Sequence, residues 1–143
     1  MRIADVLRSK GAAVATVTET TTVTGLLAEL ATHNIGAMVV VGADGKIVGM
    51  VSERDVVRRL HEQGADLLRR PVSDIMTGLV VTCTPDEAVD NLSAVMTNNR
   101  VRHVPVVVDG RLAGIVSIGD VVKLRMELLQ AEQEHLQAYI TGG

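Results

Sequence analysis

Residues 47–57 read IVGMVSERDVV, and residues 112–122 read LAGIVSIGDVV. The two stretches align without a gap, and Gly, Val, Ser, Asp, Val and Val recur at the same places. In each stretch a predicted strand runs into Ser-x-x-Asp, the pattern that caps the first turn of a helix. The chain therefore contains the same structural unit twice.

The repeat extends upstream of both stretches. In each copy, apolar residues spaced i, i+3, i+7 mark the buried face of a helix. Asp-Gly at 44–45 and at 109–110 predicts a hairpin turn after each of these helices. The helical residues are Val23, Leu26 and Leu30 in the first copy and Val89, Leu92 and Met96 in the second.

Each copy is predicted to fold as strand, helix, strand, strand, helix. The helix of the second copy is expected to start at Pro85, because Thr84 and Glu87 supply a capping residue and a capping-box glutamate around a proline at the first helical position. A single copy of about 55 residues would be marginal alone. We therefore expect an α/β (α+β) fold, in which two βαββα repeats pack with pseudo-twofold symmetry, plus a C-terminal helix. The predicted strands are 14–17, 37–41 and 46–51, then 79–83, 103–108 and 111–116; the first helices are 20–33 and 85–98, and the second helices begin just after Ser52 and Ser117.

The repeat sets the expected division of the chain. The first repeat covers 1–60, a linker 61–71, the second repeat 72–125 and a helical tail 126–143. An interrupted apolar stripe runs along this last helix, which we expect to continue to about residue 140. It packs either on its own module or against another chain, and the sequence leaves both open. The stripe consists of Val122, Met126, Leu129, Leu136 and Ile140.

Composition narrows the class of protein. Hydrophobic residues make up 47% of the chain, but the only aromatic residue is Tyr139, so the core must be aliphatic. A net charge of −3 argues against a dedicated nucleic-acid binder. Cys83 is the single cysteine, forms no internal disulfide and is expected to be a small buried hydrophobe. No apolar run is long enough to span a bilayer, and the first residues lack the apolar core of a signal peptide. We therefore expect a cytoplasmic protein without a membrane partner.

A tandem βαββα repeat with Gly-x-Val-Ser-x-x-Asp entering its last helix resembles a CBS-domain pair, also called a Bateman module. The resemblance covers residues 1–125, and stand-alone bacterial CBS-pair proteins with a short helical tail are the most similar in organisation. It implies a non-catalytic module that binds AMP, ADP, ATP, NAD or S-adenosylmethionine in clefts between the repeats. It also implies a disc-like homodimer, which would pass the ligand signal to an effector protein on another chain.

The two Ser-x-x-Asp boxes have a structural and a functional interpretation. Ser52 with Asp55, and Ser117 with Asp120, can cap their helices. The same geometry suits a nucleotide, because a helix start offers free N–H groups to a phosphate and a carboxylate can accept from ribose hydroxyls. The resemblance assigns the phosphate to the serine and the ribose to the aspartate.

Cations come from different positions in the two copies. Arg54 lies in the first turn of its predicted helix, where the helix dipole disfavours a positive charge, and Gly119 takes its place in the second copy. Arg100, Arg102 and His103 precede the second copy's hairpin, whereas the aligned residues of the first copy are uncharged. We therefore expect Arg54, Arg102 and His103 to hold anions from different edges of the two sites.

The resemblance also implies two slots for the base, each beside the first strand and the start of the second. The first copy has Val39 where the second has Pro105, a departure from a common feature of the family. The slot residues are Thr16, Val17, Thr18, Ala37 and Met38 in the first copy, and Thr82, Cys83, Thr84, His103, Val104 and Pro105 in the second.

Two other functions are compatible with such a fold, namely an enzyme acting on a nucleotide and a structural dimerisation module without a ligand. Against an enzyme, the four histidines show no metal-ligand spacing, Cys83 has no evident histidine partner, and no phosphate-binding loop of the G-x-x-x-x-G-K type occurs. Against an empty dimer, both Ser/Asp pairs and the three cations are present. A nucleotide-sensing module is therefore the expected function.

Overall fold

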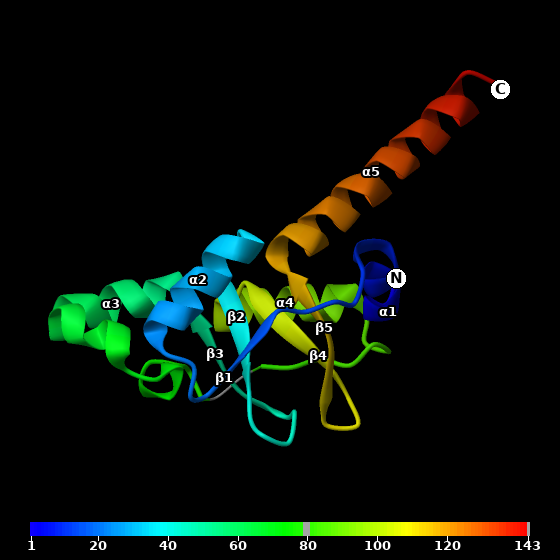
Figure 1. Cartoon of the computed structure of the whole chain (residues 1–143). Helices are drawn as coiled ribbons and strands as arrows, with labels where there is room; N and C mark the ends of the chain where they lie inside the picture. The colour runs from blue at the N-terminus through cyan, green and yellow to red at the C-terminus, as the bar shows by residue number, and fades with distance from the viewer. Residues whose placement is uncertain (79–80, 143) are drawn as a thin grey trace.

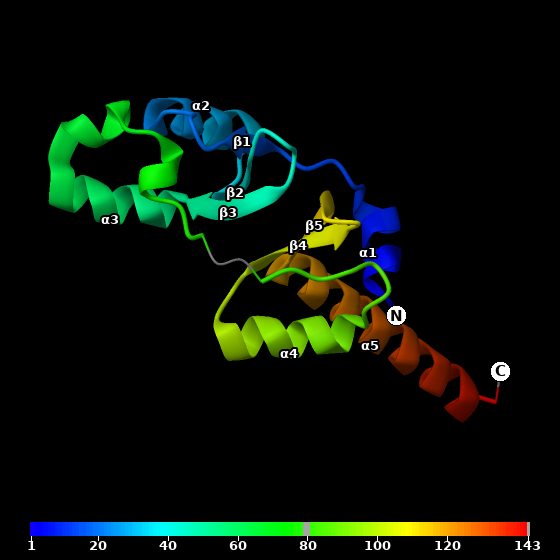
Figure 2. The same ribbon diagram turned by 90° about the horizontal axis from the view of Figure 1, so that it is seen from below.

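The computed structural model of the chain describes residues 1–78 and 81–142. The elements divide into two halves that lie side by side (Figures 1 and 2). The first half contains β1 (Thr16–Thr18), α2 (Val23–His33), β2 (Ala37–Val41), β3 (Ile47–Ser52), α3 (Glu53–Gln63) and the 3-10 turns η1 (Gly64–Arg69) and η2 (Val72–Asp74). The second half contains α4 (Val89–Asn99), β4 (His103–Val108), β5 (Arg111–Ser117) and α5 (Ile118–Ile140), together with α1 (Ile3–Lys10) from the start of the chain. The predicted α/β architecture of two repeats is thus confirmed.

The two hairpins have the same register. β2 pairs antiparallel with β3, which places Ala37 opposite Ser52. β4 pairs antiparallel with β5, which places His103 opposite Ser117. Both predicted hairpins therefore form, and each delivers a serine to the start of a helix.

The leading strands differ between the copies. In the first copy β1 runs parallel to β2 over three residues, slightly downstream of the predicted 14–17. In the second copy the prediction was 79–83, of which 79–80 lie outside the described residues. Cys83 makes an isolated parallel bridge to Val106, with its N–H donated to Pro105 O at 3.0 Å. The described part of the predicted strand is thus reduced to one bridge, because the chain turns immediately afterwards at Pro85.

The predicted start of a helix at Pro85 is wrong, since α4 begins at Val89. Thr84 N–H donates to the Glu87 carboxylate at 3.1 Å, as in the expected box, but the Glu87 N–H donates to the Thr84 backbone carbonyl oxygen at 3.2 Å. These two contacts close a turn instead of a helix. Ala88 remains extended and bridges to Arg2, so pairing with the start of the chain delays the helix.

Both second helices begin where the sequence predicts. Ser52 and Ser117 are the N-caps of α3 and α5, and each completes a capping box with the aspartate three residues later. α5 reaches Ile140, as expected.

Each half has its own aliphatic core, and the cores exchange segments across the repeat boundary. Leu67, Val72 and Ile75, from the end of the linker and the start of the second copy, are buried in the first core. Ile3 and Val6 of α1 are buried in the second core, where Cys83 also lies. Figure 2 shows α1 beside β5. The first helix of the chain therefore belongs physically to the second half.

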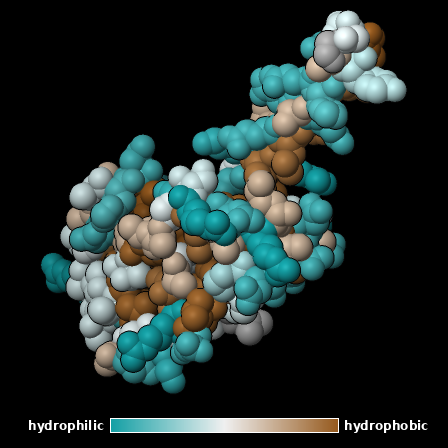
Figure 3. Space-filling model, turned by 90° about the vertical axis from the view of Figure 1, so that its right-hand side faces the viewer, coloured by the Kyte–Doolittle hydropathy of each residue, from teal (hydrophilic) through white to brown (hydrophobic). Residues whose placement is uncertain are grey.

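The tail helix projects from the body of the molecule (Figures 1 and 3). Val121 is its buried residue and Leu124 is half-buried, whereas all five residues of the apolar stripe are exposed. Of the two interpretations of the stripe, packing on its own module is contradicted. Across the described residues, no helix is both long and apolar enough to cross a bilayer.

Candidate ligand-binding site

Two cavities lie between the halves. The first has a volume of about 310 Å³ and the second of about 380 Å³. Ala37 and His103 line both, so they mark the boundary between the cavities. The first cavity is also lined by Met50, Val51, Ser52, Asp55 and Thr77, and by Val81, Arg100, Val101 and Arg102. The second is also lined by Lys10, Ala13, Val14, Ala15, His33, Ile35, Met38 and Val39, and by Ile115 and Ser117.

On one wall of the first cavity lies the capping box of α3. Asp55 N–H donates to Ser52 Oγ at 3.3 Å, and Ser52 N–H donates to Asp55 Oδ2 at 2.8 Å. Both residues are half-buried. No lysine or arginine of the described chain forms an ion pair with Asp55. A hydroxyl, a helix start and a carboxylate without a cationic partner therefore face the same space.

Basic residues of the second copy line the same cavity. Arg100 is the left-handed C-cap residue of α4, and Arg102 and His103 lead into β4. The first cavity thus combines a carboxylate from one copy with two guanidinium groups from the other. Guanidinium groups and a helix start suit phosphate oxygens, whereas a carboxylate suits hydroxyl donors such as those of a ribose.

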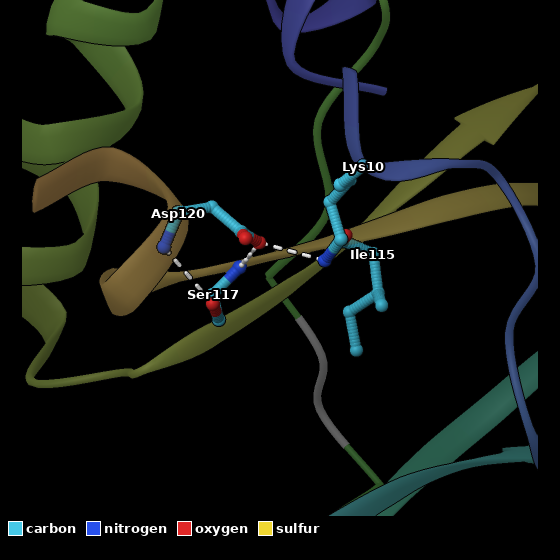
Figure 4. A network of polar contacts seen from close by, with 4 residues as sticks. All are labelled: Lys10, Ile115, Ser117 and Asp120. Carbon is cyan, nitrogen blue, oxygen red and sulfur yellow. Dashed lines mark hydrogen bonds and ion pairs between the residues drawn. The ribbon is translucent and has the colours of Figure 1, made fainter. Parts of the chain in front are cut away.

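The second cavity is built differently. Ser117 lines it, but Asp120 does not. Lys10, the last residue of α1, lines the second cavity instead. Its ammonium donates to Asp120 Oδ2 at 2.6 Å and to the Ile115 carbonyl oxygen at 2.8 Å (Figure 4). Sequence reasoning missed Lys10, because only the docking of α1 on the second half brings it to this place.

Three titratable groups are shifted by these surroundings. Burial acts to raise the pKa of Asp120, but hydrogen bonds from Lys10 and Ser117 outweigh it and hold the pKa below its ordinary value. Burial, with Lys10 and Arg102 nearby, lowers the pKa of His103. Burial, with a smaller effect of Glu87, raises the pKa of Cys83 to about 12, so its thiol remains protonated and is a poor nucleophile.

The structure brings only part of the predicted set to the cavities. Ala37, Ser52, Asp55, Arg102 and His103 meet at the first cavity, and Ala37, Met38, His103 and Ser117 at the second. Arg54 is exposed on α3 and lines neither. Of the remaining residues, which also line neither cavity, Val17, Cys83, Val104 and Pro105 are buried, Asp120 is half-buried, and Thr16, Thr18, Thr82 and Thr84 are exposed.

The second cavity is lined by residues just upstream of the predicted base slot. Ala13, Val14 and Ala15 line it in place of 16–18, because β1 begins later than the sequence suggests. No group of three or more His, Cys, Asp or Glu that could hold a metal ion occurs within the described part of the chain.

Comparison with known proteins identifies the family. The CBS domain family matches residues 3–62 and 72–127. A mitochondrial CBS domain-containing protein of Arabidopsis thaliana, CBSX3, is 38% identical over 149 residues, which cover 99% of this chain and 72% of that protein. The crystal structure of a CBS-domain containing protein from Agrobacterium tumefaciens is 46% identical and superimposes with a TM-score of 0.83 over 87% of this chain and 99% of the other.

A second similar structure contains ligands. The CBS domain pair of protein MJ0100, in complex with 5′-methylthioadenosine and S-adenosyl-L-methionine, is 27% identical with a TM-score of 0.79 over 89% of this chain and 97% of that one. The fold and the paired cavities define a tandem module with two cavities between its repeats. The chain belongs to the CBS-domain family.

Proposed function

We propose that this chain is a non-catalytic regulatory module that binds an adenine nucleotide between its two CBS repeats. The observation that carries the proposal is the first cavity, where Ser52 and Asp55 from one copy face Arg100 and Arg102 from the other. A ribose hydroxyl can donate to the free lone pairs of Asp55 while the cations and the α3 start receive the phosphate. The adenosine ligands of the MJ0100 domain pair support the same ligand class.

AMP is the ligand we favour for this cavity. Its single phosphate can lie between the α3 start and the two guanidinium groups. ATP, NAD and S-adenosylmethionine share the adenosine moiety and are the alternatives. The module is proposed to signal ligand state to a partner without chemistry of its own, and the buried, protonated thiol of Cys83 supports this.

The module acts as a homodimer in the cytoplasm and reports to an effector protein. The exposed apolar stripe of α5 supports an assembled state, since five large apolar side chains lie on one projecting helix. This stripe also favours the second candidate function, a structural dimerisation module that binds no ligand.

A thermal-shift panel with AMP, ADP, ATP, NAD and S-adenosylmethionine distinguishes a nucleotide-binding module from a dimerisation module without a ligand. A ligand at one hundred times its Kd adds about 2.7 kcal/mol to the free energy of unfolding, which raises the Tm by about 5–10 °C in a chain of this size. Asp55→Asn should fold and lose affinity tenfold or more, because a hydrogen bond to a charged group contributes about 1.5–3 kcal/mol. Asp44→Asn, in an exposed hairpin turn, is the matched control. No shift with any of the five ligands would leave only the structural function.

A further inference from the structure

The two aspartates of the repeated motif have unequal surroundings. Asp55 lines the first cavity together with its capping serine. Asp120 does not line the second cavity, although Ser117 does, and Lys10 lines that cavity instead. The second copy therefore presents an ammonium group where the first copy presents a carboxylate.

The contact between Lys10 and Asp120 is close and partly shielded from water. The Nζ–Oδ2 distance is 2.6 Å, and the two side chains are 31% and 22% exposed. The same Oδ2 accepts the Ser117 N–H at 2.8 Å. Lys10 Nζ also donates to Ile115 O at 2.8 Å, so the ammonium is held by two oxygens of the second half (Figure 4).

The position of Lys10 is fixed by the docking of α1. At its N-terminal end, Ile3 N–H donates to Glu87 O at 2.9 Å and Ala4 N–H donates to Pro85 O at 2.9 Å. In the middle, Leu7 packs against the backbone at Gly114, where an added Cβ would lie 2.7 Å from a Leu7 methyl carbon. Lys10 is the last residue of this anchored helix. Its amine therefore acts as a built-in partner of Asp120.

We propose that Lys10 closes the second cavity to a ribose by occupying Asp120, so that the chain binds one adenine nucleotide strongly, in the first cavity. A second nucleotide binds only when it displaces Lys10 from the carboxylate. This inference rests on the proposed function. The displacement loses a charge-assisted hydrogen bond, which makes the second site at least tenfold weaker than the first.

Calorimetric titration with AMP tests the inference on the full chain. The wild-type chain should bind one AMP strongly, with any second AMP at least tenfold weaker. Lys10→Met should strengthen the second site tenfold or more, and Lys10→Gln should do the same with a polar side chain of similar length. Arg8→Met, which removes a cation of the same helix that pairs with Asp5, is the matched control and should leave both sites unchanged. Adding Asp120→Asn to Lys10→Met should abolish the gain.

The outcomes separate the inference from the proposed function. Two equal sites in the wild-type chain, or an unchanged second site in both Lys10 variants, would overturn the role of Lys10 and leave nucleotide binding intact. Weaker second-site binding in both Lys10 variants would mean that Lys10 contacts the ligand, which would also overturn the proposal that Lys10 closes the second cavity. Absence of AMP binding to the wild-type chain and to both variants would overturn AMP binding and the inference together.

Discussion

Ala37 and His103 occupy the same place in the two copies, and each lines both cavities. Ala37 lies opposite the capping serine Ser52, and His103 lies opposite the capping serine Ser117. One copy therefore contributes a methyl group to the boundary between the cavities, and the other contributes an imidazole. Only the second copy can change charge at this position near neutral pH.

His103→Gln should make the chain less sensitive to mild acid. Burial, helped by Lys10 and Arg102 and opposed by Asp120, lowers the pKa of His103 below its ordinary value of 6.5. As pH falls through that value, the unfolded chain binds the proton more readily than the folded chain, so the free energy of unfolding decreases. The decrease should be smaller in His103→Gln. Urea unfolding at about pH 7.5 and about pH 5.5 measures the difference.

His135→Gln, on the exposed tail, is the control and should behave like the wild-type chain. Equal losses of stability in the wild-type chain and in His103→Gln would show that His103 is not protonated preferentially in the unfolded state.

Arg102→Ala should weaken AMP binding more than Arg54→Ala. The sequence predicts that both arginines hold anions, but Arg102 lines the first cavity and Arg54 does not. Arg54 lies in the first turn of α3, so its removal should leave the ligand-free chain unchanged or stabilise it by a few tenths to about 1 kcal/mol. Titration calorimetry and urea unfolding of both variants measure these effects. A larger loss of AMP affinity in Arg54→Ala than in Arg102→Ala would show that Arg54, and not Arg102, is the main contact of the ligand.

Gly49→Ala should destabilise the fold by about 1–3 kcal/mol, because overpacking forces backbone to move. A Cβ at Gly49 would lie 2.5 Å from the carbonyl oxygen of Thr77. This backbone is fixed, since Met50 and Thr77 exchange two hydrogen bonds of 3.1 and 2.8 Å. Gly114→Ala is the matched comparison in the second copy, where the near atom belongs to the flexible side chain of Leu7. Urea unfolding of both variants measures the loss of unfolding free energy, which should be smaller for Gly114→Ala. Equal losses in the two variants would count against a rigid contact at Gly49.

Truncation after Leu128 should weaken self-association. It removes the exposed apolar residues Leu129, Leu136 and Ile140 while leaving the buried start of α5 in place. Light scattering over a concentration series compares the intact chain, expected to be a dimer, with the shortened one. Leu129→Gln combined with Leu136→Gln should reproduce the effect in a full-length chain. If both variants remain dimeric at the same concentrations, the tail lies outside the interface.

The sequence predicts the local features of this fold and misses the non-local ones. The Ser-x-x-Asp boxes and the hairpins are correct, because capping and turn formation depend on residues a few positions apart. The predicted start of α4 is wrong, because Ala88 pairs with Arg2, which is distant in sequence. Lys10 went unnoticed for the same reason, since its partner Asp120 is distant in sequence. Arg100 precedes the predicted cations Arg102 and His103 in the sequence, but its left-handed conformation at the end of α4 does not follow from the sequence pattern.

The docking of α1 on the second half has a consequence for biosynthesis. A ribosome releases α1 well before its partner strand β5, because the whole first half and α4 lie between them in the chain. The first core draws on residues from Val17 to Ile75 and can close while synthesis continues. Ile3 and Val6 stay uncovered until the second hairpin is made. The long segment between α1 and this hairpin makes their association slow. Helix α1 is thus made before the first half but folds after it, and a product that stops before β5 would carry an apolar helix with nowhere to dock.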